Sequence, residues 1–173
     1  DGISLLKWLI SLFSWLTKVN FSHSRIIMRY YTAVLSFFFI VSFTGWEHDF
    51  GIALQKAKKE HKLILLNFSG SDWCVPCIRL HKEVFANSSF KIFADSNLIL
   101  VNADFPRLKK NQLSKEQQKM NEELADKYNP QGSFPYTVLV DEEGKVIWTW
   151  EGYPNLKAEQ FAGQLKTYVD AHR

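Results

Sequence analysis

Two cysteines, Cys74 and Cys77, are the residues of this chain best suited to redox chemistry, and the 173-residue sequence holds no others. They follow an apolar run, Leu63–Phe68, which predicts a buried strand that ends just before a helix. A cysteine at a helix N-terminus faces unpaired backbone N–H groups and the positive end of the helix dipole, and both favour the nucleophilic thiolate. We expect Cys74 to be this nucleophile and the more exposed sulfur. Cys77, one helical turn later, can attack a mixed disulfide formed by Cys74, so the pair predicts a two-electron dithiol–disulfide centre.

Three segments of the sequence carry a resemblance to a known family: LLNFSGSDWCVPC, NLILVNADF and GSFPYTVLVDEEGKVIWTWEGY. Together they resemble the thioredoxin superfamily, and in particular its exported bacterial thiol:disulfide oxidoreductases, over roughly residues 46–173. The resemblance implies an α/β thioredoxin fold, a central mixed β-sheet flanked by helices. It also implies that the Phe134–Pro135 peptide bond is cis and that no cofactor is needed. The residues it implies for substrate binding are Trp73, Pro76, Phe134 and Pro135, with Trp73 as a flat apolar platform.

The dipeptide between the cysteines, Val75-Pro76, lacks the histidine that strongly oxidising members of the family often carry there. The resemblance therefore favours a reductase of protein disulfides, which would need a membrane electron donor in an oxidising compartment. An oxidase or isomerase remains open. So does a Cu(I) or Zn chaperone that uses Cys74, Cys77 and His81, because these three share one helical face. That set supplies at most three ligands and no second cysteine pair exists, so we expect no bound metal.

The sequence departs from the family pattern in two places. Many thioredoxins bury an acid beneath the pair, but the matching position here is Asn67 or Phe68, and neither titrates. Proton handling would then fall to water, Asp72 or Glu83. The stretch over 106–120 is longer than in small thioredoxins, and we interpret it as a surface insertion, with a partner-docking lid as the alternative.

The first 45 residues differ from the rest in charge and in pattern. They carry the whole formal charge of +3, whereas residues 46–173 balance 17 basic against 17 acidic side chains, which argues against nucleic-acid binding. From Met28, a short basic start and an apolar run over 33–43 are typical of a secretory signal, cleaved or kept as an N-terminal membrane anchor. Residues 1–27 are either an over-extended start or an amphipathic membrane-surface helix. We therefore expect residues 46–173 to form the thioredoxin-like domain, exported and periplasmic or anchored facing the periplasm.

The periodicity of residues 46–173 predicts the elements that position the site. Helices are expected over 46–61, 74–86, 120–128 and 158–172, with a short helical turn over 90–94. Strands are expected over 63–68, 97–105, 136–140 and 145–150, the last two forming a hairpin. A further first strand, present in many family members, is either absent or hidden near Trp46.

Overall fold

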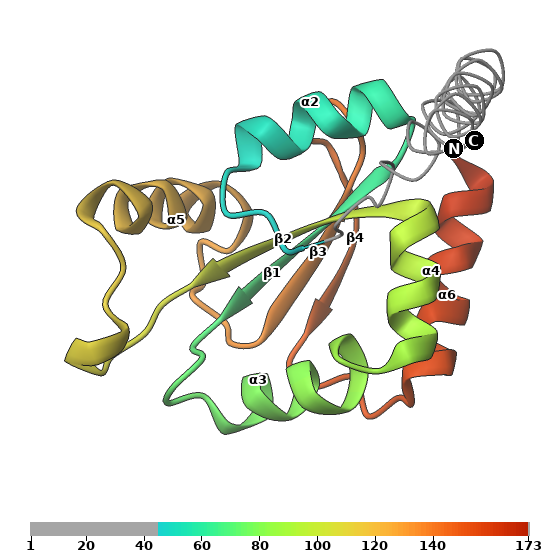
Figure 1. Ribbon diagram of the computed structural model, residues 1–173. Coiled ribbons are helices and arrows are strands. Elements are labelled where there is room, and N and C mark those ends of the chain that lie inside the picture. The colour runs from blue at the N-terminus through green and yellow to red at the C-terminus, as the bar shows by residue number, and fades with distance from the viewer. Residues whose placement is uncertain (1–44, 173) are drawn as a thin grey trace, which may run out of the picture. The chain divides into compact units, whose positions relative to one another are not determined.

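The computed structural model describes residues 45–172 (Figure 1). In chain order the elements are α2 (Phe50–Glu60), β1 (Leu63–Ser69), α3 (Val75–Leu80), the π-helical turn η1 (His81–Phe85), α4 (Ser88–Asn97), β2 (Leu98–Asp104), the 3-10 turn η2 (Lys109–Asn111), α5 (Lys115–Tyr128), β3 (Tyr136–Val140), β4 (Val146–Glu151) and α6 (Ala158–Ala171). The predicted signal or anchor, and the expectations for residues 1–27, lie outside the described residues. Within the described residues, no helix combines the length and the hydropathy that a bilayer crossing requires.

The four strands form one mixed sheet in the order β2-β1-β3-β4. β1 pairs with β2 in parallel and with β3 antiparallel, and β3 pairs antiparallel with β4. This confirms the predicted thioredoxin fold with a central mixed sheet. Glu47 adds an isolated parallel bridge to Val101 beyond β2, which is where the hidden strand near Trp46 was expected.

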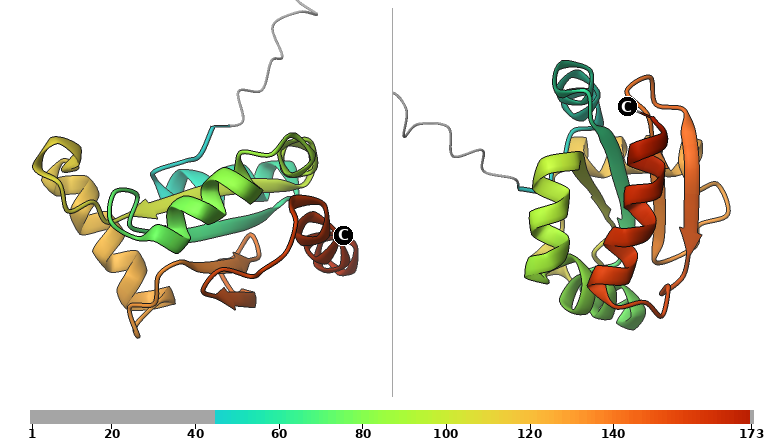
Figure 2. Two further views of the ribbon diagram at one scale, coloured as in Figure 1. Left: turned by 90° about the horizontal axis from the view of Figure 1, so that it is seen from below. Right: turned by 90° about the vertical axis from the view of Figure 1, so that its right-hand side faces the viewer.

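Helices cover both faces of the sheet, and β1 supplies side chains to each core because successive strand residues point to opposite faces. Leu63 and Leu65 pack with α4 and α6, whereas Ile64, Leu66 and Phe68 pack with α2 and α5. The right-hand view of Figure 2 shows α4 and α6 side by side on their face of the sheet. The next residues of β1 on the α4 and α6 face are Asn67 and Ser69, so this face turns polar as the strand approaches the cysteines.

The starts of three predicted helices differ from the structure, and a capping side chain explains each difference. The first helix begins at Phe50 rather than Trp46, because Asp49 accepts a hydrogen bond from the Ile52 N–H. Asn87 caps α4, which is a full helix instead of a short turn. Ser114 caps α5, which begins five residues before the predicted start at residue 120.

The predicted helix over 74–86 has a change of winding in its second half. After α3, the Ala86 N–H donates to the His81 carbonyl 2.8 Å away, five residues back, which is the π-helical pattern. Val84 and Phe85 both lie in the core although they are neighbours in sequence. The wider turn accommodates both side chains against the sheet.

Candidate functional site

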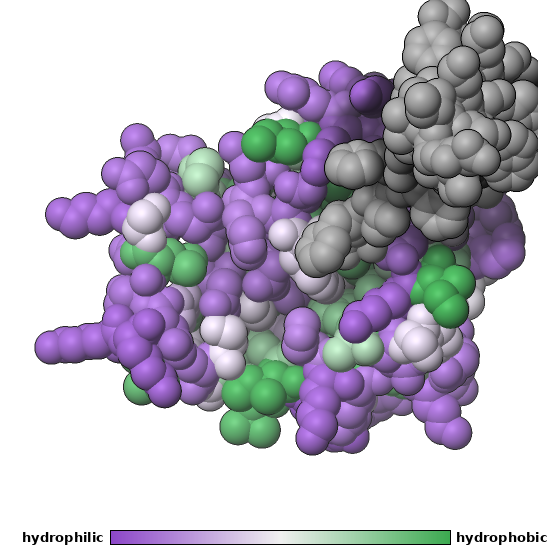
Figure 3. Space-filling model, viewed as in Figure 1, coloured by the Kyte–Doolittle hydropathy of each residue, from purple (hydrophilic) through white to green (hydrophobic). Residues whose placement is uncertain are grey.

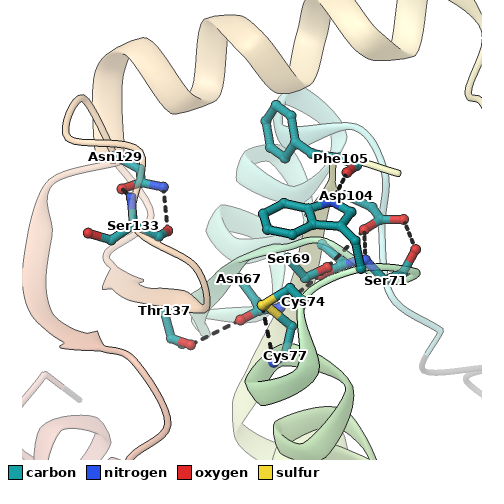
Figure 4. Close-up of a disulfide and its surroundings, with 12 residues drawn as sticks. Asn67, Ser69, Ser71, Cys74, Cys77, Asp104, Phe105, Asn129, Ser133 and Thr137 are labelled. Atoms are coloured by element: carbon teal, nitrogen blue, oxygen red, sulfur yellow. Dashed lines mark hydrogen bonds between the residues drawn. A yellow bond between two sulfur atoms is a disulfide. The ribbon is translucent and has the colours of Figure 1, made fainter. Parts of the chain in front are cut away.

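The two cysteines form a disulfide at the N-terminus of α3 (Figure 4). Cys74 is the N-cap residue, and its Sγ accepts a hydrogen bond from the Cys77 backbone N–H at 3.3 Å. The loop before it is closed by the Cys74 N–H, which donates to the Gly70 carbonyl at 2.9 Å. Each cysteine residue is 4% exposed, so the expectation that Cys74 would be the more exposed sulfur is wrong for this disulfide form. The hydrogen bond from the Cys77 N–H shows that a donor of the helix N-terminus faces Cys74, as predicted.

An apolar surface surrounds the disulfide on the α3 side. Val75 is 74% exposed and Ile78 is 45% exposed, and Pro76, also exposed, occupies the first turn of the helix. Figure 3 shows an apolar patch over α3 at the lower edge of the molecule. Because the backbone N–H groups of the first turn have no intrahelical partner, Pro76 is accommodated there without loss of a hydrogen bond.

Trp73 is held in place by contacts from three directions. Its Nε1 donates to the Phe105 carbonyl at 2.7 Å, and its ring meets the Phe134 ring edge-on with centroids 5.5 Å apart. The Arg107 guanidinium lies 3.7 Å from the centre of the indole. The expected apolar platform is thus partly covered by a cation, which no local sequence pattern indicated.

The Phe134–Pro135 peptide bond is cis, as the resemblance implied. The loop that carries it is fixed by Asn129, a buried residue that sequence reasoning missed. Its side chain accepts from the Ser133 N–H at 3.0 Å and donates to the Ser133 carbonyl at 2.9 Å (Figure 4). The Pro135 carbonyl accepts from the Gly152 N–H at 2.8 Å, which ties the loop to the end of β4.

A continuous strip of polar side chains crosses the sheet on the face that carries the disulfide. Asn67 Nδ2 donates to Asn102 Oδ1 at 2.9 Å, and the Thr137 hydroxyl donates to Asn67 Oδ1 at 3.1 Å. The Ser69 hydroxyl is within hydrogen-bond distance of Asn102 Oδ1 and of Asp104 Oδ1, at 3.2 and 3.1 Å. The strip replaces the buried acid of many thioredoxins by neutral groups and ends at the Asp104 carboxylate.

Sequence reasoning identified only Asn67 from this strip, although a signal for the rest was present. Asn102 and Asp104 alternate along the polar end of β2 just as Asn67 and Ser69 do along β1. The parallel register pairs Asn67 with Asn102 and Ser69 with Asp104. Aligning the two strand ends would have predicted the pairs.

The two carboxylates that we considered as proton acceptors, Asp72 and Glu83, are both occupied by hydrogen bonds to other groups. Asp72 accepts from the backbone N–H groups of Arg107 and Leu108, at 2.9 and 3.0 Å, and from Asn111. The hydrogen bond from the Arg107 N–H is the main reason why the pKa of Asp72 lies below its usual value. A carboxyl group held as an anion in this way is a poor proton acceptor.

Glu83 is engaged on the other side of α3. It accepts from the Tyr153 hydroxyl at 2.6 Å and from the Arg79 guanidinium at 3.0 Å. The Tyr153 hydrogen bond and then the Arg79 hydrogen bond lower the pKa of Glu83. This cluster joins the helix of the cysteines to the segment before α6.

The segment over 106–120 forms part of the site as well as part of the surface. Asp72 anchors its first residues, and Arg107 covers Trp73. Between this segment, Trp73 and Phe134 lies a groove of about 450 Å³, whose rim includes Gln118 and Glu122. The groove lies on the side of the disulfide that carries the cis-proline loop.

A second cavity, of about 370 Å³, lies behind the disulfide. Its lining residues are Trp46, His48, Asn67, Ser69, Ser71, Cys77, Ile78, His81, Lys82, Phe85 and Asn102. Cys77 and His81 thus share this cavity. Over residues 45–172, where both cysteines are bound in the disulfide, no group of three or more His, Cys, Asp and Glu side chains is placed to hold a metal ion.

Comparisons with known proteins agree with this geometry. A family model described as a thioredoxin-like domain matches residues 50–168. The disulfide bond reductase DsbH of Chlamydia pneumoniae is 43% identical over 102 residues, which is 59% of this chain and 59% of that protein. The thioredoxin-related protein DsbJ of the same organism is 28% identical over 126 residues, 73% of this chain and 35% of that protein. This chain therefore spans less than two thirds of the length of each of these curated relatives.

A solved structure of a DsbH oxidoreductase superimposes with a TM-score of 0.66 at 35% identity. The match covers 73% of this chain and 84% of that chain.

Proposed function

The chain belongs to the thioredoxin-like domain family, and from this premise we propose that it is an enzyme that reduces protein disulfides through Cys74 and Cys77. The observation that carries the proposal is the Cys74–Cys77 disulfide at the N-terminus of α3. A pair of cysteines close enough to form a disulfide can cycle between the dithiol and the disulfide state. The resemblance to a protein named disulfide bond reductase supports the reductive direction.

The reaction proceeds in two exchange steps. The Cys74 thiolate attacks one sulfur of a substrate disulfide, the other substrate sulfur leaves as a thiolate, and a mixed disulfide remains. Cys77 then attacks Cys74 Sγ, which releases the second substrate thiol and closes the Cys74–Cys77 bond. Two electrons pass from the dithiol to the substrate.

The substrate chain lies across the surface formed by Trp73, Pro76, Phe134 and Pro135. An extended segment can pair with the backbone beside the cis-proline, and its cysteine then faces Cys74. The exposed side chains of Val75 and Ile78 add apolar contact area. The partners are thus proteins with accessible disulfides, and recognition is mainly apolar.

The place of action that we propose is outside the cytoplasm, in the periplasm, with residues from Met28 as signal or anchor. An oxidising compartment returns the enzyme to its disulfide form, so a membrane electron donor has to reduce it again.

The test of the function is insulin reduction with dithiothreitol as donor, together with the reduction potential of the Cys74–Cys77 pair against glutathione. We expect turnover and a potential well below about −220 mV, typical of reductases. A potential near about −120 mV would instead indicate an oxidase. No turnover of insulin would contradict the proposed function in either direction.

A further inference from the structure

The cavity behind the disulfide raises a question that the proposed function leaves open, namely what removes the proton of Cys77. Thiol–disulfide exchange requires a thiolate, and a buried thiol keeps its proton unless a base is near. In the described structure Asn67 cannot titrate, and Asp72 and Glu83 are bound elsewhere as anions. The candidates for the base are therefore the groups that line the cavity together with Cys77.

The titratable side chains that line this cavity come from two segments. His81 and Lys82 belong to η1, and His48 belongs to the chain before α2. The strands β1 and β2 contribute only neutral groups, namely Asn67, Ser69 and Asn102. The nearest carboxylate of the polar strip, Asp104, is reached through Ser69 and also accepts from the Ser71 N–H at 2.8 Å.

Among these groups, the histidines are the ones that can accept a proton near neutral pH. A lysine ammonium is protonated at neutral pH and has no free pair of electrons, so Lys82 can only stabilise a thiolate. Imidazole changes its protonation state between about pH 5 and 8 and accepts a proton when neutral. Helix geometry then favours His81 over His48 as the base for Cys77.

His81 lies one helical turn after Cys77, and its backbone N–H donates to the Cys77 carbonyl. Residues four apart on a helix are neighbours, with about 5–6 Å between their Cβ atoms. Helical side chains lean toward the helix N-terminus, which is the direction in which Cys77 lies from His81. The cavity also has room for a bridging water.

We propose that His81 is the base that deprotonates Cys77 in the resolving step, an inference that rests on the proposed function. The proton moves from Cys77 Sγ to the neutral imidazole, directly or through one water. The Cys77 thiolate then attacks Cys74 Sγ, the Cys74–Cys77 bond forms, and the substrate thiolate leaves with the electron pair of the broken bond. The imidazolium afterwards returns its proton to solvent, to which His81 is exposed.

The two exchange steps can be followed separately with one equivalent of the chromogenic disulfide dithiobis-nitrobenzoate. Attack by Cys74 releases one nitrothiobenzoate ion, and resolution by Cys77 releases the second. The experiment compares the fully reduced wild type with His81→Ala and His81→Asn in a stopped-flow instrument from pH 5 to 9. His172→Ala serves as the matched control, because His172 is exposed and does not line the cavity.

In the wild type, we expect the second phase to accelerate over the pH range in which an imidazole loses its proton. Both His81 variants should keep the first phase within about twofold and slow the second phase at pH 7 at least tenfold, since general base catalysis commonly contributes about 10²–10⁴-fold. Their second phase should accelerate only above about pH 8.5, the ordinary pKa of a thiol, because burial disfavours the thiolate. Added imidazole should restore the second phase in His81→Ala and leave His172→Ala unchanged.

Three results would overturn the proposal. A second phase with wild-type rate and pH dependence in both His81 variants would remove His81 from the step and leave the proposed function intact. Slowing by His48→Ala but not by His81→Ala would assign the step to the other histidine. Absence of the first phase in the wild type would overturn the proposed function, and this inference with it.

Discussion

At the scale of single residues, the two cysteines differ by position rather than by exposure. Both are equally buried in the disulfide, but only Cys74 accepts the hydrogen bond of the first helical turn. A thiolate at Cys74 is stabilised by that N–H and by the helix dipole, whereas Cys77 lies inside the helix. This asymmetry assigns attack to Cys74 and resolution to Cys77.

Replacement of each cysteine should therefore give a different product. We expect Cys74→Ser to abolish insulin reduction, because no nucleophile remains. Cys77→Ser should accumulate mixed disulfides with substrate, visible as a mass increase on a non-reducing gel and in intact mass spectra. Each variant is the control for the other. Faster labelling of Cys77 than of Cys74 by iodoacetamide at pH 7 in the reduced protein would reverse the assignment.

Asn67 is the residue at which the neutral polar strip can be tested. In Asn67→Asp the new carboxylate would face Asn102 Oδ1, which now accepts from Asn67 Nδ2. Burial disfavours the anion and raises the pKa of the introduced carboxyl in the folded state above its unfolded value. The acid form can donate to Asn102, so stability is retained at low pH and lost as the pH rises through the folded-state pKa.

We expect Asn67→Asp to be close to the wild type near pH 4 and destabilised near pH 7 by about 1–3 kcal/mol, the usual penalty for an unsatisfied buried polar group. Urea unfolding of the disulfide form at both values measures the difference. Asn67→Ala, which does not titrate, is the control and should show a deficit that is independent of pH in this range. A pH-independent deficit in Asn67→Asp would show that the strip accommodates a carboxylate.

At the scale of elements, the loop between β1 and α3 depends on a glycine that leaves room for Trp73. A Cβ placed on Gly70 would lie 2.3 Å from Trp73 Cε2, much closer than atoms can approach. The indole would have to move, and its contacts with Phe105, Phe134 and Arg107 would change with it.

Gly70→Ala should lower kcat/KM for insulin and destabilise the protein by about 1–3 kcal/mol, the usual range for overpacking. Gly163→Ala is the matched control, because a Cβ at this exposed position of α6 meets no atom within 4 Å. It should gain about 0.5–1 kcal/mol from helix propensity and keep full activity. Equal activity of the two variants in the insulin assay would contradict the positioning role of Trp73.

The cluster of Arg79, Glu83 and Tyr153 joins η1 to the segment before α6. Tyr153 and Arg79 lower the pKa of Glu83, in that order of importance. A carboxyl with a depressed folded-state pKa stabilises the fold above its unfolded pKa, and this stabilisation is lost as the pH falls through the folded-state value. Acidification should therefore weaken the interactions of Glu83 with Tyr153 and Arg79.

Tyr153→Phe should lower stability at pH 7, and the difference from the wild type should shrink as the pH falls through the folded-state pKa of Glu83. Thermal unfolding followed by circular dichroism across this range provides the measurement. Tyr168→Phe is the control, because the Tyr168 hydroxyl makes no hydrogen bond in the described structure and its loss should change little at any pH. A constant difference between Tyr153→Phe and wild type would show that Glu83 is not the titrating partner.

At the scale of the whole molecule, the elements of the thioredoxin fold all lie within residues 45–172. The residues described for both cores lie in this range. The site, its two cavities and the cis-proline loop are also contained there.

A protein comprising residues 46–173 should therefore fold cooperatively and reduce insulin, as measured by urea unfolding and by turnover with dithiothreitol. In cells, we propose that the segment from Met28 directs export, so alkaline phosphatase fused after Trp46 should be active when translation starts at Met28. A fusion with the apolar run over 33–43 deleted is the control and should stay inactive. An unfolded 46–173 protein, or a Met28 fusion without activity, would contradict the predicted division of the chain.

The features that depend on neighbours along the chain can be predicted from the sequence. The strand before Cys74, the cysteine pair at a helix start, the hairpin after Pro135 and the apolar faces of the helices follow from local periodicity and turn chemistry. The cis bond at Pro135 came from the family resemblance. Helix ends were less well predicted, because single capping side chains such as Asp49, Asn87 and Ser114 decide them.

The contacts between distant residues around the disulfide follow from the three-dimensional arrangement of the elements and cannot be predicted from local sequence. The hydrogen bonds of Asn67 join residues 35 and 70 positions apart, and they depend on the register of two strand pairs. The stack of Arg107 on Trp73 and the shared cavity of His48, Cys77 and His81 depend on how the segments fold back against the sheet. Local propensity carries no information about such pairings, because they are set by packing between elements that are far apart along the chain.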